Sequence, residues 1–134
     1  MTKQTKNIDK EIKNLEILYK KEPKNIPIII NLANAYISSG NFELALKLTK
    51  LANKFSPENM GIDFTLSNLI DYSIDQTHQK VMLKKSENNS FKEEDKIPLY
   101  FALGKSFNDQ KNYSKSFYFY SLGNKIKNSK LKNY

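Results

Sequence analysis

The sequence predicts an all-α protein, a right-handed α-solenoid of about seven helices: one orphan helix followed by three helix pairs. Apolar residues recur at spacings of three and four along the 134 residues, which is the period of one helix face. Pro23-Lys24-Asn25 returns 34 positions later as Pro57-Glu58-Asn59. Ala45 and Ala52 lie one heptad apart between these breaks, where small residues let two helices pack closely. A fixed period of this length is typical of stacked helical hairpins.

An orphan helix is predicted over residues 7–22. Asn7 is suited to cap its start, and Lys20 and Lys21 suit the negative end of its dipole. Because it ends like the later hairpin, we interpret it as the second half of a repeat whose first half is missing. Its apolar face comprises Ile8, Ile12, Leu15, Leu18 and Tyr19.

Residues 26–59 are predicted to form the most regular repeat. Asn25 caps its first helix, Gly40 ends that helix in the left-handed conformation, and Asn41 caps the return helix. The expected inward face comprises Ile29, Leu32, Ala33 and Tyr36, followed by Phe42, Ala45, Leu48, Ala52 and Phe55.

Residues 60–96 are predicted to be a degenerate repeat with a loop. Ile70 takes the place of Tyr36 within its first helix, and Asp75 takes the place of Asn41 as the cap of a return helix. Gln79 stands where the regular repeat has a small alanine, so looser or rotated packing is expected there.

Residues 97–128 are predicted to be a third repeat, because Ile97-Pro98 resembles the start of the regular one. Asn112 caps its return helix, and Gly123 stands where the regular repeat has Ala52. A basic tail over 129–134 completes a chain that we expect to be a single domain, 1–134.

This order of large, small and helix-breaking residues resembles the tetratricopeptide (TPR) repeat, most closely in residues 26–59. TPR arrays are scaffolds whose ligand depends on their groove. The resemblance therefore implies an interaction module with a protein or peptide partner.

A narrower resemblance rests on the FALGK block at 101–105, the aromatic residue after Asn112 and the pair Gly123-Asn124, preceded by Asp71-Tyr72-Ser73 with His78 and Met82. These residues look like the TPR region that precedes the catalytic domain in bacterial TPR-containing sulfotransferases. The likeness covers about 60–128 and implies an accessory N-terminal region of a sulfotransferase-like protein.

That family's catalytic domain, with its loop for the sulfate donor's 5′-phosphosulfate, has no counterpart up to Tyr134. The chain by itself is therefore expected to be non-catalytic, with no cofactor. The alternative is that it is part of a sulfotransferase whose catalytic domain lies outside this chain.

The amino-acid composition argues for or against the remaining classes of function. There is no cysteine, and His78 is the only histidine, which argues against thiolate and histidine metal sites. The net charge is +8, but every basic residue is lysine, and arginine is the residue that best reads nucleic acid. A basic module that binds nucleic acid or anionic membrane through 125–132 is the weaker alternative. With neither a membrane span nor a signal peptide, a cytoplasmic protein is expected.

The predicted peptide groove is formed by polar and apolar positions on the first helix of each repeat. Asparagine side chains there can hold the backbone of a peptide, and a lysine can meet a carboxylate. The alternative is that these residues simply face solvent. The candidates are Ile30, Asn34, Ile37, Phe64, Asn68, Asp71, Phe101, Lys105 and Asn108.

Aromatic residues cover all sides of the predicted last helix at Phe117, Tyr118, Phe119 and Tyr120. Two of these rings should face inward, which leaves two for a contact with a partner, a second copy or a sulfotransferase domain. The alternative is partly exposed tyrosines that need no cover.

His78 is expected to be a lone histidine on a solvated helix rather than a proton-transfer group. The acidic run Glu93-Glu94-Asp95 is expected to favour a helix N-terminus, because it lacks converging partners for a metal.

Overall fold

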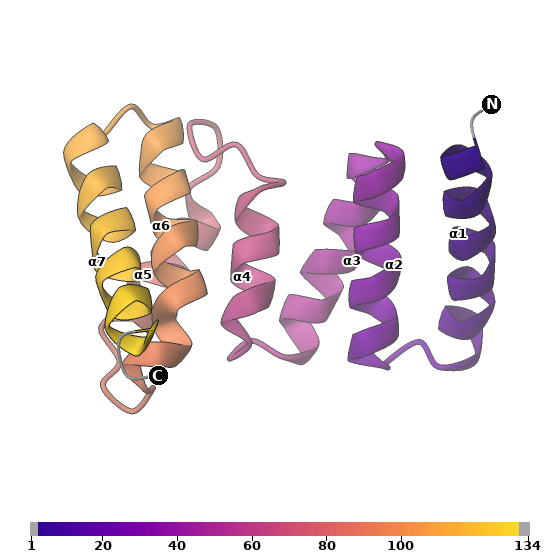
Figure 1. Cartoon of the computed structure of the whole chain (residues 1–134), viewed down its shortest axis with the longest axis horizontal. Helices are drawn as coiled ribbons and strands as arrows, with labels where there is room; N and C mark the ends of the chain where they lie inside the picture. The colour runs from indigo at the N-terminus through magenta and orange to yellow at the C-terminus, as the bar shows by residue number, and fades with distance from the viewer. Residues whose placement is uncertain (1–2, 132–134) are drawn as a thin grey trace. The chain divides into compact units, whose positions relative to one another are not determined.

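The computed structural model describes the backbone of residues 3–131 and the side chains of residues 6–131, and all of its regular structure is helical. The chain divides into two compact units, Met1–Asn59 and Met60–Tyr134. The boundary falls where the regular repeat was predicted to end. The helices of each unit are labelled in Figure 1.

The first unit contains α1 (Lys3–Lys21), α2 (Ile26–Ser39) and α3 (Phe42–Phe55). The orphan helix is confirmed, but it begins earlier than predicted, so Asn7 lies inside it and does not cap it. Lysine and glutamine before Asn7 are good helix formers, which extends the helix toward the N-terminus. The Tyr36 hydroxyl of α2 donates to the Glu16 carboxylate of α1 over 2.9 Å and links the two helices.

The α2–α3 hairpin confirms the predicted regular repeat. The Asn25 side chain accepts from the Ile28 N–H and that of Asn41 from the Leu44 N–H, both at 3.3 Å. Gly40 has a φ of +83°, a conformation that favours glycine. Ala45 and Ala52 are fully buried, as the close packing of the two helices requires.

Two phenylalanines of the predicted inward face are exposed. Phe42 is 59% exposed and Phe55 is 40% exposed, in contrast to the buried Leu48 between them. Both phenylalanines stand at the ends of α3. The predicted face is therefore correct only for its central turns.

The second unit contains α4 (Met60–Ser67), α5 (Thr77–Ser86), the 3-10 turn η1 (Glu93–Lys96), α6 (Ile97–Asp109) and α7 (Tyr113–Leu131). The last helix includes residues 129–131 of the predicted basic tail, and residues 132–134 lie outside the described residues. Asn112 caps α7 as predicted, since its side chain accepts from the Lys115 N–H at 3.3 Å.

The degenerate repeat differs from its prediction in its first helix. The helix α4 ends at Ser67, so Ile70 lies in the following turn and does not continue the helix. The side chains of Ser67 and Asn68 both donate to the Phe64 carbonyl, which competes with the helical bond at that position. The Asp75 side chain accepts from the Thr77 N–H, but Gln76 holds the N-cap position of α5.

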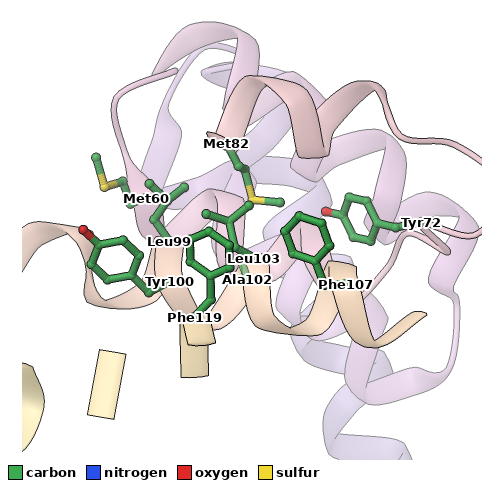
Figure 2. Close-up of a cluster of buried hydrophobic side chains, with 9 residues drawn as sticks. All are labelled: Met60, Tyr72, Met82, Leu99, Tyr100, Ala102, Leu103, Phe107 and Phe119. Atoms are coloured by element: carbon green, nitrogen blue, oxygen red, sulfur yellow. The ribbon is translucent and has the colours of Figure 1, made fainter. Parts of the chain in front are cut away.

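The core of the second unit surrounds α6. Leu99, Ala102 and Leu103 are fully buried, and in Figure 2 Met82 of α5 points toward Leu103. Phe119 of α7 closes the other side by stacking on Phe107, with ring centroids 5.7 Å apart. The cluster comprises Met60, Tyr72, Met82, Leu99, Tyr100, Ala102, Leu103, Phe107 and Phe119.

Two glycines permit the close approach of α6 and α7. A Cβ atom at Gly104 would lie 2.8 Å from the Tyr120 ring, and one at Gly123 would lie 3.2 Å from the Phe101 ring. These residues carry much of the resemblance to the sulfotransferase TPR region. Their pattern is explained by helix packing.

We expect Gly104→Ala to lower the free energy of unfolding of the second unit by about 1 kcal/mol. Overpacking against Tyr120 costs about 1–3 kcal/mol, whereas alanine gains about 1 kcal/mol over glycine in a helix. Urea denaturation measures the net effect. In a Tyr120→Ala background the same substitution should become neutral or stabilising. A gain in stability from Gly104→Ala in the wild-type background would contradict the tight packing.

Candidate functional site

The predicted groove residues are placed separately in the two units. In the first unit, Asn34 is exposed on α2 between the half-buried Ile30 and Ile37. In the second unit, Phe64 lies on α4 and is 41% exposed, and Asn68 and Asp71 follow it in the turn. Half-buried Phe101 and Lys105 and exposed Asn108 lie on α6.

Several groove candidates of the second unit already have partners within the chain. The Lys105 ammonium donates to the Ile70 carbonyl and to the Asp109 carboxylate, each over 2.6 Å. It also lies 5.4 Å from the centroid of the Tyr72 ring. Asp71 accepts from the hydroxyl and N–H of Ser73, which lower the pKa of its carboxyl, with Lys105 adding a smaller effect. These contacts fix the turn between α4 and α5 onto α6, and peptide binding at this surface stays a prediction.

The aromatic run on α7 divides into two inward and two outward rings, as expected. Phe119 is 9% exposed and Tyr120 is half-buried against Phe101. Phe117 is 75% exposed and Tyr118 is 59% exposed. Tyr113, one turn before Phe117, is also exposed, and we call these three exposed rings the aromatic face of α7. A contact between that face and a partner stays a prediction.

The interpretation of His78 as a solvated side chain is wrong. Its Nε2 lies 2.8 Å from the Asp63 carboxylate, its Nδ1 lies 2.7 Å from the Tyr72 hydroxyl, and its side chain is only 12% exposed. Lys85 donates to the other Asp63 oxygen over 2.6 Å. Asp63 lies fifteen residues before His78, so helical spacing around His78 could not reveal it.

The hydrogen bonds of this network hold buried parts of the second unit together. A carboxylate only accepts, so Nε2 of His78 carries the proton that points to Asp63, and Nδ1 lies where it can accept from the Tyr72 hydroxyl. Burial, followed by the charges of nearby aspartates, raises the pKa of Tyr72 and keeps its hydroxyl a donor. Asp63 and Tyr72 are both fully buried. The network ties α4, α5 and their connecting turn together.

Gln79 has a related role. Its amide donates to the Ser106 hydroxyl over 3.0 Å and exchanges hydrogen bonds with the amide of Gln110. The buried glutamine thus replaces the small residue of the regular repeat by a hydrogen-bonded contact with α6. Within the described residues, no buried side-chain nitrogen or oxygen lacks a hydrogen-bond partner.

Two side chains of the acidic run Glu93-Glu94-Asp95 have partners within the chain. Glu93 accepts from the buried Lys96 and from the Tyr100 hydroxyl, and Glu94 pairs with Lys130. The bond to Glu93 adds to the effect of burial, and the pKa of Tyr100 rises to about 12. In the described part of the chain, no cluster of three or more histidine, cysteine or acidic side chains is arranged to hold a metal ion.

A pocket of about 530 Å³ opens in the first unit, and sequence patterns did not indicate it. Helices α1 and α3 each pack against α2, which forms the floor between them. We call it the α1–α3 pocket. None of the predicted groove residues lines it. Its lining comprises Glu16, Tyr19 and Lys20 of α1, Leu32 and Tyr36 of α2, and Leu44, Lys47, Leu48, Lys50, Leu51 and Lys54 of α3.

The α1–α3 pocket combines an apolar interior with a basic rim. Leucines of α2 and α3 form its interior, and Leu44 remains 39% exposed. Four exposed lysines stand against one acidic residue, Glu16, whose carboxylate accepts from Tyr36. That bond and the burial of the phenol raise the pKa of Tyr36 to about 12. Leu44 and Leu51 lie outside the predicted core face of α3, which is the signal that could have indicated the pocket.

The comparisons with known proteins support the fold. No protein-family model matches the sequence, and no curated protein does. The chain is similar to a solved structure of MamA, a TPR-containing protein (MamA MSR-1 C2), with a TM-score of 0.64 and 18% sequence identity. The similarity covers 95% of this chain and 71% of that chain. No helix among residues 3–131 is long and apolar enough to cross a membrane. The architecture is that of a TPR-like α-solenoid.

Proposed function

We propose that the chain is a non-catalytic protein-interaction module and that the α1–α3 pocket binds a segment of a partner protein. The observation that carries this proposal is the apolar interior of the pocket, open beside exposed lysines on a TPR-like scaffold. Exposed apolar surface of this kind is typical of interaction sites. The buried hydrogen-bonding groups of the second unit support the fold.

A capture experiment from extracts of the source organism tests the pocket. Leu44→Glu places a charge on the pocket interior at a position that is 39% exposed, so the helix should still fold. Phe42→Ser is the matched control, because Phe42 is exposed on the same helix but does not line the pocket. We expect a partner to be captured by the wild type and the control and lost with Leu44→Glu. Equal capture by all three proteins would contradict the proposal.

Docking of a sulfotransferase domain is a narrower form of this proposal. Its support is the resemblance of about residues 60–128, in which Gly104 and Gly123 also serve the packing of α6 and α7. Coding sequence for such a domain, in frame with this chain, would support it.

Contact through the aromatic face of α7 likewise stays a prediction. The exposure of Tyr113, Phe117 and Tyr118 supports it. Light scattering of the wild type would detect self-association through that face, and a monomer at high concentration would count against it.

A further inference from the structure

Building on the proposed function, we infer that the segment bound in the α1–α3 pocket is an acidic amphipathic helix of a partner protein. Leu44, Leu48 and Leu51 follow one another at intervals of four and three along α3, which makes them a ridge on one helix face. A second helix fits such a ridge when its own apolar residues recur at the same intervals. The floor supplied by Leu32 of α2 completes an apolar trough.

The polar groups of the lining favour a helix over an extended peptide. An extended peptide brings unpaired backbone groups that need donors and acceptors in its site. The lining contains no asparagine, glutamine, serine or threonine, and its lysines can only donate. The acceptors left for peptide N–H groups are the Tyr19 hydroxyl and the Glu16 carboxylate, which is already bonded to Tyr36. A helix satisfies its own backbone hydrogen bonds, so it can occupy the trough with apolar side chains alone.

The positive charge of the rim indicates which residues should flank the leucines of the bound helix. Lys47, Lys50 and Lys54 follow the ridge on α3, and Lys20 stands on the α1 side. The carboxylate of Glu16 accepts from Tyr36 and is the one acidic group of the lining against four lysines, so the rim stays positive. A helix with glutamate or aspartate on both sides of its leucine stripe would complement this rim, and the attraction would weaken with added salt.

The pocket also favours a helix over a membrane surface. Membrane binding requires apolar side chains that project from the protein into the lipid. Leu48 is only 8% exposed and Leu32 is 1% exposed, so these two leucines are recessed, whereas Leu44, at 39%, lies near the surface. A protruding ridge of side chains can reach them, whereas a flat lipid surface cannot.

The test uses the full chain and a labelled peptide of about 18 residues, or about five turns, with leucines at alternating intervals of three and four and flanking glutamates. Fluorescence anisotropy should show saturable binding that weakens with salt. Lys47→Glu/Lys54→Glu should weaken it about tenfold or more, because attraction becomes repulsion. A peptide with lysines in place of the glutamates should regain affinity for this variant.

Lys125→Glu/Lys127→Glu is the matched control, with the same change of charge at exposed positions of α7. It should bind the acidic peptide like the wild type. Equal weakening by both double variants, or equal binding of a scrambled peptide, would overturn the inference. So would binding to phosphatidylglycerol vesicles without binding to the peptide. If Leu44→Glu abolishes capture of a partner while the peptide fails to bind, the proposed function stands and the acidic helix is wrong.

Discussion

Asp63→Asn is expected to lower the free energy of unfolding of the second unit by about 3 kcal/mol. Removing one partner of a buried ion pair costs about 3–5 kcal/mol, because the remaining charge is left buried without compensation. Asp63 is fully buried and accepts from both His78 and Lys85, so one substitution affects two partners. The lower end of the range applies because the Lys85 side chain is 11% exposed and can turn toward water.

Urea denaturation followed by circular dichroism measures this loss, and hydrogen exchange of the α6 amides assigns it to the second unit. The control is Asp71→Asn, because Asp71 is exposed and its partner Ser73 can be retained by the amide oxygen. The control should remain within about 0.5 kcal/mol of the wild type. If Asp63→Asn proved as mild as Asp71→Asn, the network would have no structural role.

A second variant separates two free energies: what the Asp63–His78–Lys85 network contributes to stability, and what it costs to remove only one of its members. Replacing Asp63, His78 and Lys85 together by leucine or methionine removes every charge at once. Such a replacement is often neutral or stabilising, since no charge remains to be desolvated. We expect the triple variant to be more stable than Asp63→Asn, because only the uncharged Tyr72 hydroxyl loses its His78 partner.

The regular hairpin could be predicted from the sequence because its signals are local. Asn25, Gly40 and Asn41 determine the helix ends through their own backbone and side-chain bonds. The degenerate repeat was less predictable, because Ser67 and Asn68 bond to the Phe64 carbonyl and end α4 where the periodic pattern continues. The spacing of apolar residues does not show where polar side chains compete with the backbone hydrogen bonds of a helix.

The candidate sites were predicted less well, because they depend on contacts between distant residues. The role of His78 is set by Asp63 and Tyr72, which reach it from α4 and from the turn. The α1–α3 pocket requires α1 and α3 to flank α2, an arrangement that the spacing within α3 cannot reveal. That residues 1–134 act as a single domain also stays a prediction.

The aromatic run Phe117–Tyr120 shows both what helical spacing predicts and what depends on distant contacts. Four successive aromatic residues on a helix must point in different directions, so two inward rings were predictable. Which two face inward depends on α6, where Tyr100 and Phe107 provide ring surfaces for Phe119. This difference between neighbouring phenylalanines leads to a paired experiment.

Phe119→Ala is expected to destabilise the second unit by about 3–5 kcal/mol, the usual cost of truncating a buried phenylalanine. Phe119 is 9% exposed and stacks on Phe107 with an interplanar angle of 3°. Its removal would leave a cavity between α6 and α7 and would also remove the edge-on contact with Tyr118, whose ring centroid is 5.0 Å away. Urea denaturation measures the change.

Phe117→Ala is the matched control, with the same atoms removed from the same helix two residues earlier. Phe117 is 75% exposed, so its truncation should change stability by no more than about 0.5 kcal/mol. Similar losses from the two substitutions would contradict the orientation of α7. If Phe117→Ala were destabilising only at high protein concentration, the exposed aromatic face would be covered by a second copy, because association stabilises the folded state by mass action.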